Sequence, residues 1–356
     1  MRVVSIVGAR PQFVKAAAVG RELRTAATEI LVHTGQHYDA GMSEVFFDEL
    51  GIPEPDLNLE VGSGPHGRQT GRMLERIEEV LLVEQPDWVL VYGDTNSTLA
   101  GALAAAKLHI RVAHVEAGLR SFRRDMPEEV NRVVTDHVSD LLFCPTQTAV
   151  DHLAAEGVTE GVMLVGDVMV DAIGLVRGRI DAGRLRRLRV DGPYLLATLH
   201  RAENVDDAQR LGQALGVLAA MPERVVIPVH PRTAAAMRRH DLTWPVNVAP
   251  LAPVGYVDML TLVAGADAVL TDSGGLQKES VLLGTPCITL RKETEWVETV
   301  DAGMNRVVDL DAQAAREALE ELRGADNAGI EHIFPPGASR RIVEALQGRS
   351  PVGEPR

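Results

Sequence analysis

Short runs of β-branched and aliphatic residues alternate along almost the whole chain with longer segments rich in Ala, Leu, Glu and Arg. VVSIV from Val3 and EILVHT from Glu29 are typical of strands, whereas TLAGALAAAKL (98–108) is typical of a helix. Continuous apolar runs suit strands that are covered on both faces, so the alternation predicts doubly wound α/β architecture with parallel sheets. Further strands are expected at 88–92, 111–116, 141–145, 162–166, 194–200, 225–230, 246–251, 268–272 and 286–290.

The chain has 356 residues, more than one hydrophobic core usually supports, so two domains are expected. A polar stretch at 181–193 carries no strand pattern, and the alternation restarts at Tyr194. We therefore expect one Rossmann-like domain over 1–170 and a second over 171–339. A terminal segment over 340–356 would contain the end of the helical pattern ASRRIVEALQG and a frayed tail rich in Pro and Gly.

Charge and composition narrow the classes of partner. The formal net charge is −14, which argues against nonspecific binding to nucleic acid or to an anionic membrane surface. No run approaches the roughly 20 apolar residues that span a bilayer, and the N-terminus lacks the pattern of a signal peptide. Cys144 and Cys287 lie in apolar runs and are expected to be buried thiols. These features predict a cytoplasmic protein.

Polar residues follow the predicted strands, where open α/β sheets bind their ligands. Asp94 follows one strand of the first half and Glu116 ends another, while His200 and His230 end strands of the second half. If the two halves face each other, these groups line one cleft. Gly8, Ala9 and Arg10 follow the first strand, and Asp272, Ser273, Gly274 and Gly275 follow the strand at 268–272.

Several of these residues also have purely structural interpretations. Pro11 suits the first position of a helix, and Asp94 or Thr95 could cap the helix that follows. Glu128 and Glu129 in a first helical turn would complement the helix dipole without any chemistry.

The same alternatives apply to the second half. SGGLQKES (273–280) fits a tight turn, or a helix N-terminus that cradles phosphate. A lone histidine at a strand end is commonly structural, but His200 and His230 are each followed within two residues by an arginine, Arg201 or Arg232. That pairing favours anion binding.

Two familiar cofactor signatures are missing. No G-x-G-x-x-G follows the first strand and no G-x-x-x-x-G-K-[ST] occurs, so neither NAD, flavin nor a P-loop nucleotide is indicated. The carboxylates do not cluster with Cys or His at metal-ligand spacing, so no metal is expected.

The motifs in their order resemble those of the non-hydrolysing UDP-N-acetylglucosamine 2-epimerases over about residues 1–347. The resemblance implies a GT-B fold, with UDP held mainly by the second domain and the terminal helix packed back on the first. It also implies a homodimer that uses neither a metal nor a nicotinamide cofactor. The motifs are GARPQFVK (8–15), TGQHYD (34–39), GDTNST (93–98), HVEAGLRS (114–121), PEEVNR (127–132), HRAEN (200–204), PVHPR (228–232) and TDSGGLQKE (271–279).

The resemblance also implies a mechanism. A base removes the proton on sugar carbon 2 while UDP leaves carbon 1, and UDP adds again after the proton returns on the other face of the bound 2-acetamidoglucal. Such chemistry needs carboxylates near the sugar and cations or N–H donors near the diphosphate. The implied acid–base residues are Asp94, Glu116, Glu128 and His200. The implied substrate-binding residues are Arg10, Lys15, His230, Ser273, Gly274, Gly275 and Glu279, the last on the ribose hydroxyls.

Some motifs depart from those of many bacterial members and resemble a subgroup. Gln12 stands where G-T-R-P-E has Glu, and Trp296 stands where T-E-R has Arg. The subgroup includes enzymes that act on UDP-2,3-diacetamido-2,3-dideoxyglucuronic acid, which stays open as the alternative substrate to UDP-N-acetylglucosamine. Residues matching a second, activating substrate site in other members are Gln36, His37, Arg72 and Arg201.

Two rivals from other functional classes remain. A GT-B glycosyltransferase would share the fold but would need an acceptor, and it would not need so many carboxylates. A non-catalytic sensor would bind the sugar nucleotide without proton exchange at carbon 2.

Overall fold

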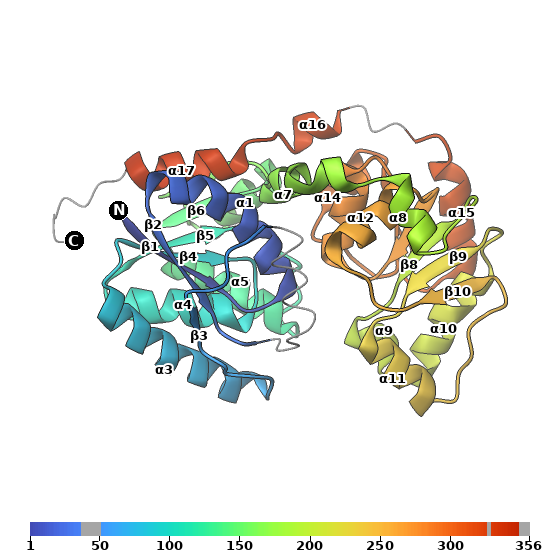
Figure 1. Ribbon diagram of the computed structural model, residues 1–356, viewed down its shortest axis with the longest axis horizontal. Coiled ribbons are helices and arrows are strands. Elements are labelled where there is room, and N and C mark those ends of the chain that lie inside the picture. The colour runs from blue at the N-terminus through green and yellow to red at the C-terminus, as the bar shows by residue number, and fades with distance from the viewer. Residues whose placement is uncertain (37–50, 326–328, 349–356) are drawn as a thin grey trace. The chain divides into compact units, whose positions relative to one another are not determined.

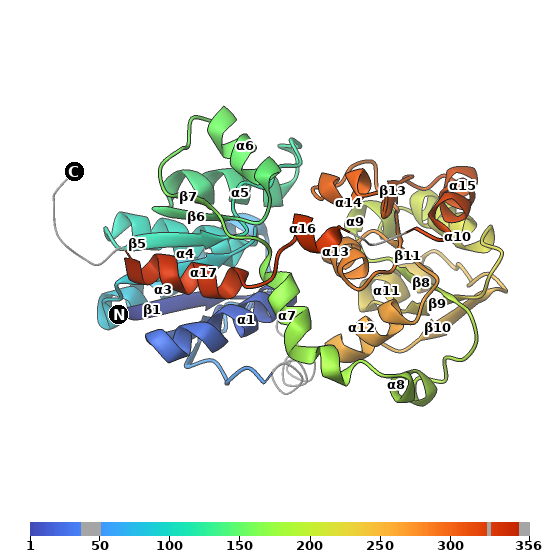
Figure 2. The same ribbon diagram turned by 90° about the horizontal axis from the view of Figure 1, so that it is seen from above.

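The structure, a computed structural model, describes residues 1–36, 51–325 and 329–348 (Figures 1 and 2). By their contacts the residues divide into two compact units, which we call unit 1 (Met1–Leu175 with Ile333–Arg356) and unit 2 (Val176–His332). The chain therefore leaves unit 1 once and returns to it near its end.

Unit 1 is built on a parallel sheet in the order β3-β2-β1-β4-β5-β6-β7. Helices α3, α4 and α5 cover one face, and α1 and α17 cover the other (Figure 1). The strands are β1 (Arg2–Val7), β2 (Thr28–His33), β3 (Leu57–Asn58), β4 (Trp88–Tyr92), β5 (Arg111–Val115), β6 (Leu141–Cys144) and β7 (Val162–Leu164). The helices are α1 (Arg10–Ala26), α3 (His66–Glu84), α4 (Asn96–Lys107), α5 (Pro127–Val138), α6 (Gln147–Ala155), α7 (Val168–Val176) and α17 (Ala338–Gly348). Helix α7 ends at the boundary with unit 2, and the short helix α16 (Ile330–Ile333) lies in unit 2 except for its last residue.

Unit 2 repeats the architecture with the order β10-β9-β8-β11-β12-β13, again all parallel. The strands are β8 (Leu195–Thr198), β9 (Val225–Pro228), β10 (Val248–Leu251), β11 (Ala268–Thr271), β12 (Cys287–Thr289) and β13 (Asn305–Val307). The helices are η1 (Arg177–Arg179, 3₁₀), α8 (Ala182–Arg187), α9 (Ala202–Val205), α10 (Ala208–Ala219), α11 (Pro231–Arg239), α12 (Tyr256–Ala264), α13 (Gly274–Leu282), α14 (Val297–Asp301) and α15 (Ala312–Leu322).

Each sheet has the strand order that creates a topological switch point, where ligands of open α/β sheets bind. In unit 1 the switch lies between β1 and β4, so it is flanked by the loop at Gly8 and the loop at Asp94. In unit 2 it lies between β8 and β11, next to His200 and Asp272. The strand order therefore places Gly8, Asp94, His200 and Asp272, which the sequence predicted at strand ends, beside the switch points of their sheets.

The predicted strands are confirmed, with differences at their ends. Glu116 lies just beyond β5 and has a left-handed backbone, φ +71°, because the chain turns sharply there. His200 lies two residues beyond β8. The short strands β3 and β13 were not predicted, and the polar stretch at 181–193 contains the helix α8.

Helix α17 is fixed to unit 1 by its apolar face and by its first turn. Its apolar residues, including Ile342 and Leu346, are buried, and the helix packs on α1. The carboxylate of Asp171 on α7 accepts hydrogen bonds from the N–H groups of Gly337 and Ser339, each at 2.7 Å. Asp171 thus caps a helix that is far away in sequence.

The Asp171→Ala variant is expected to lose about 1–2 kcal/mol of unfolding free energy, because two N–H groups at the start of α17 lose their acceptor. Urea unfolding followed by circular dichroism measures this loss. The matched control is Arg340→Ala, since Arg340 is exposed on α17 and pairs with Glu344 at 3.6 Å. Equal losses in the two variants would contradict the capping role of Asp171.

None of the helices in the described parts of the chain combines the length and apolar character needed to cross a membrane.

Candidate active site

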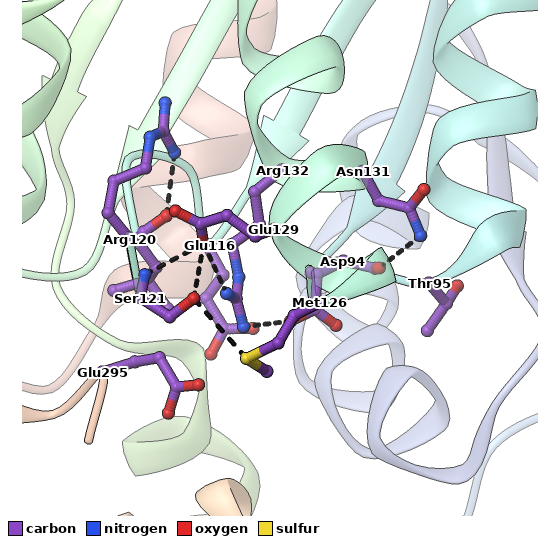
Figure 3. Close-up of polar contacts among 12 residues, drawn as sticks. Asp94, Thr95, Glu116, Arg120, Ser121, Met126, Glu129, Asn131, Arg132 and Glu295 are labelled. Carbon is purple, nitrogen blue, oxygen red and sulfur yellow. Dashed lines mark hydrogen bonds and ion pairs between the residues drawn. The ribbon is translucent and has the colours of Figure 1, made fainter. Parts of the chain in front are cut away.

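Asp94 follows β4, and residues of helix α5 hold both its side-chain carboxylate and its backbone carbonyl. Arg132 Nη2 lies 2.5 Å from Asp94 Oδ2, and Asn131 Nδ2 donates to the backbone carbonyl of Asp94 at 2.9 Å (Figure 3). The cap of α4 is Thr95, whose hydroxyl accepts from the N–H of Thr98. Of the two capping alternatives the structure therefore selects Thr95, and the carboxylate of Asp94 pairs with a guanidinium instead.

Arg132 is itself positioned by Glu129, one helical turn earlier. Glu129 Oε2 accepts from Arg132 Nη1 at 3.0 Å, and Glu129 also accepts the N–H groups of Ser121 and Phe122, both at 2.9 Å (Figure 3). Glu129 is buried, whereas Glu128 in the same turn is exposed. Glu129 thus joins the loop after β5 to the helix that holds Asp94.

Glu116 is the second carboxylate at this edge of the sheet. Its left-handed backbone lets the N–H groups of Glu116 and Ala117 both bond the carbonyl of Phe143 at 3.1 Å. Its side chain forms an ion pair with Lys15 of α1, and both side chains are largely buried. The structure thus brings together two of the predicted residues from elements 101 positions apart.

The loop after β1 is tied to the loop after β4 by the amide of Gln12. Gln12 Oε1 accepts the N–H groups of Gly8 and Ala9 at 2.8 and 3.1 Å, and Nε2 donates to the carbonyl of Tyr92 at 2.7 Å. A Cβ atom on Gly8 would lie 2.1 Å from Ser97 Oγ, so only glycine fits there. This close packing fixes the backbone beneath Arg10, the first residue of α1.

The predicted residues of the second, activating site come from different elements of the described structure. Gln36 Oε1 accepts from the N–H and hydroxyl of Ser97 at 3.1 and 2.7 Å, so its amide is engaged at the start of α4. Arg72 is exposed on α3, and Arg201 belongs to unit 2. His37 lies outside the described residues.

In unit 2 the fully buried carboxylate of Asp272 organises the loop after β8. It accepts the N–H groups of His200 and Arg201 at 3.0 Å and lies 3.3 Å from the Nδ1 atom of His200. The ring of His200 also packs against that of His230, with 5.4 Å between centroids. His230 caps α11, because its Nδ1 accepts from the N–H of Arg232 at 3.1 Å. The two predicted histidines therefore lie together.

Helix α13 presents its N-terminus at the same switch point. Ser273 is the cap, with its hydroxyl accepting from the N–H of Leu276 at 3.3 Å. Around Gly275 there is open space, since a Cβ atom there would approach only Ser273 Oγ, at 4.0 Å. Such an open, glycine-lined helix start suits an anionic group. Glu279, half-buried, lies one turn further along.

Beside this helix start lies a buried ion pair that the sequence did not indicate. Arg291 binds Glu295 through two parallel contacts of 2.8 and 2.9 Å. A Cβ atom on Gly274 would lie 3.7 Å from Arg291 Nη1, so the pair borders the start of α13. Glu295 is also 3.9 Å from Arg201. The guanidinium of Arg291, beside the candidate anion site, is therefore already paired with the carboxylate of Glu295.

Several supporting residues were not predicted from the sequence: Gln12, Glu129, Asn131, Arg132, Arg291 and Glu295. The spacing of Glu129 and Arg132, three residues apart on one helix face, was an available signal. Burial raises the pKa of the thiols of Cys144 and Cys287 to about 12, so neither is a nucleophile. In the described parts of the chain, no group of three or more His, Cys, Asp or Glu side chains could hold a metal ion.

Comparison with known proteins assigns this arrangement to a family. The family model described as UDP-N-acetylglucosamine 2-epimerase matches residues 21–347. A UDP-2,3-diacetamido-2,3-dideoxy-D-glucuronate 2-epimerase of Pseudomonas aeruginosa is 50% identical over 359 residues, covering 97% of this chain and 99% of the relative. A UDP-N-acetylglucosamine 2-epimerase homolog of Methanococcus maripaludis is 48% identical over 355 residues, covering 98% and 99%.

A solved structure leads to the same family. The UDP-GlcNAc 2-epimerase of Methanocaldococcus jannaschii, in complex with UDP-GlcNAc and UDP, matches with a TM-score of 0.92 and 41% identity. The match covers 98% of this chain and all of that one. The GT-B fold expected from the resemblance is thereby confirmed. With two parallel α/β units and matches over nearly its whole length, the chain belongs to the UDP-N-acetylglucosamine 2-epimerase family.

Proposed function

We propose that this protein is an isomerase that inverts carbon 2 of a UDP-linked N-acetylhexosamine, converting UDP-N-acetylglucosamine to UDP-N-acetylmannosamine. UDP leaves carbon 1 as the proton leaves carbon 2, and both return to the 2-acetamidoglucal, the proton on the opposite face. The single observation that carries the proposal is the pair of carboxylates, Asp94 and Glu116, fixed at the ends of neighbouring strands by cationic side chains.

The reaction needs one group to remove the proton and another to supply it on the other face. Asp94 and Glu116 come from different strands and are oriented by different partners, Arg132 and Lys15, so each carboxylate has its own fixed direction. In this proposal they act on carbon 2, with Glu128 as the third carboxylate. His200 assists, held through its backbone N–H by Asp272.

The departing diphosphate carries the negative charge that develops in the reaction. The open start of α13 at Gly274 and Gly275 offers N–H groups to it, and the positive end of the helix dipole favours it. In this proposal Arg10, Lys15, His230 and Ser273 also serve the nucleotide sugar, and Glu279 binds the ribose hydroxyls. Gln36 and Arg201 would belong to a second substrate site, together with Arg72 and His37.

A second substrate is suggested by a specific observation. The relative that is 50% identical over 97% of this chain acts, by its name, on UDP-2,3-diacetamido-2,3-dideoxy-D-glucuronate. The same carboxylates and the same diphosphate site would serve that substrate, because the bonds that break are the same.

We further propose that the protein is cytoplasmic and forms a homodimer.

Proton NMR in heavy water with UDP-N-acetylglucosamine tests the proposal. We expect a second anomeric signal, together with loss of the coupling between the anomeric proton and the proton on carbon 2. The coupling is lost because the atom that returns to carbon 2 is deuterium from the solvent. An unchanged spectrum with this substrate, but exchange with the diacetamido uronic acid, would assign the second substrate. Turnover that requires an added acceptor would overturn the proposal in favour of a glycosyltransferase.

The Glu279→Ala variant is expected to weaken UDP binding by about 1–3 kcal/mol, because hydrogen bonds from two ribose hydroxyls to a carboxylate are lost. Isothermal titration calorimetry with UDP measures the change. Glu320→Ala is the matched control, since Glu320 is exposed on α15 of the same unit. If both variants bind UDP like the parent protein, the placement of the ribose at Glu279 is wrong.

A further inference from the structure

His114 lies within β5, between Val91 of β4 and Leu142 of β6, and its side chain is fully buried. Both of its ring nitrogens lie within hydrogen-bond distance of an oxygen atom. Nε2 is 2.7 Å from the carbonyl oxygen of Gly93, and Nδ1 is 2.7 Å from Asp136 Oδ1 on α5. A neutral imidazole has one N–H donor and therefore cannot satisfy both oxygens.

The proton that satisfies the second contact must be on the ring or on Asp136. A carbonyl oxygen only accepts, so the Gly93 contact requires a proton on Nε2. Asp136 Oδ2 accepts from Arg120 Nη1 at 2.7 Å and from the N–H of Gly118 at 3.2 Å. A carboxyl group is ordinarily more acidic than an imidazolium, and the guanidinium of Arg120 favours its ionised form further. Asp136 is therefore a carboxylate, and the second proton is on Nδ1 of His114.

We propose that His114 is an imidazolium, protonated on both ring nitrogens, that positions the two strand-end carboxylates, Asp94 and Glu116. The inference about its charge stands on the geometry alone, and its role in positioning rests on the proposed function. No role was assigned to His114 from the sequence, where it is simply the residue two positions before Glu116.

A cationic ring also balances the charges around His114. Arg120 binds Glu156 through two contacts of 2.7 and 2.9 Å, and Glu156 is exposed, whereas His114, Asp136 and Arg120 are buried. With an imidazolium the four side chains have two positive and two negative charges, whereas with a neutral ring they have one negative charge in excess. Further titratable groups border these side chains: the thiol of Cys144, protonated because burial and Asp136 raise its pKa to about 12, the exposed His137, 3.8 Å from Glu156, and His152, whose Nδ1 lies 3.0 Å from the carbonyl oxygen of Gly118.

Each proton of the ring fixes the backbone next to one carboxylate. The proton on Nε2 holds the carbonyl of Gly93, the residue before Asp94. The proton on Nδ1 holds Asp136, which in turn holds the N–H of Gly118, two residues after Glu116. Gly118 has φ +79°, and a Cβ atom there would lie 2.3 Å from the carbonyl oxygen of Ala149, so this loop has little room to move. Loss of either proton would turn one contact into repulsion between lone pairs and displace one carboxylate.

The charge is tested by ¹⁵N NMR of protein labelled at its histidine rings, with the His114→Gln variant identifying the signals. We expect both ring nitrogens of His114 to be protonated at about pH 7.5, where an exposed imidazole is largely neutral. A His114 ring with one unprotonated nitrogen near pH 7.5 would overturn the inference. This measurement needs no substrate, so it decides the charge of His114 even if the proposed reaction is not observed.

The positioning role is tested by the steady-state kinetics of His114→Gln, whose amide can replace only one of the two donors. A fall in kcat of about ten- to a hundredfold, with KM within about threefold, is expected for displaced acid–base groups. His137→Gln, on the neighbouring surface of α5, is the control and should leave kcat unchanged. Unchanged kcat in a folded His114→Gln variant would overturn the positioning role. If that variant does not fold, Asp136→Asn is measured in the same way. This substitution keeps the shape of the side chain but removes the negative charge beside Nδ1 of His114.

Discussion

The Asp94→Asn variant is expected to exchange the proton on carbon 2 about 10³-fold more slowly than the parent protein, because an amide cannot accept or return a proton. The substitution keeps the size of the side chain, and the carbonyl that Asn131 holds at 2.9 Å is unaffected. Affinity for UDP should stay within a few-fold, since in our proposal the nucleotide is bound mainly by residues of unit 2. Deuterium incorporation followed by NMR measures the first quantity, and calorimetry measures the second.

Asp125→Asn is the matched control for Asp94→Asn. Asp125 is an exposed carboxylate in the loop before α5, and its hydrogen bond with Arg123 lowers its pKa. Both variants remove one negative charge from the same unit, but only Asp94 is held at the switch point. A variant at Asp94 with the turnover of the control would remove Asp94 from the mechanism.

The order of strands and helices could be predicted because the amino-acid pattern of each element is local. Strands covered on both faces are apolar throughout, as in β4 and β6, and the residue that follows each strand must lie at the sheet edge. The amino-acid pattern alone is therefore enough to place Asp94, Glu116 and His200 at the carboxyl ends of their strands. It cannot reveal that Glu116 has a positive φ angle, since that conformation is imposed by the shared acceptor at Phe143.

Helix α5 shows why the supporting residues were not predicted. Its buried face is polar, with Glu129, Arg132 and Asp136 inside, whereas Val130 and Val134 are exposed. A pattern analysis that places apolar residues inside would turn this helix the wrong way round. The polar residues are buried because each meets a partner far away in sequence, such as Asp94 for Arg132 and His114 for Asp136. Partners that meet only in the folded chain leave no local signal.

Replacing Arg132 by Met is expected to have the second largest effect, on both stability and rate. Arg132 is nearly buried and joins Asp94, at 2.5 Å, to Glu129, at 3.0 Å. Methionine fills a similar volume but leaves two carboxylates without their shared cation. Removing one partner of a fully buried pair costs about 3–5 kcal/mol, and because Asp94 is 31% exposed we expect a loss of about 2–3 kcal/mol. Urea unfolding measures this loss.

The rate tests whether Arg132 does more than stabilise the fold. Without Arg132, Asp94 keeps its backbone contact to Asn131 but loses the direction of its carboxylate, so kcat should fall by about 10²-fold. Arg132→Lys should recover part of the rate, because an ammonium can pair with Asp94 but cannot bridge both carboxylates. Arg76→Met is the control: Arg76 is exposed on α3 and pairs with Glu79 at 3.5 Å, so its loss should cost less than about 0.5 kcal/mol. If Arg132→Met loses stability but keeps its full kcat, Arg132 supports only the fold, and the direction of the Asp94 carboxylate must be set by another group.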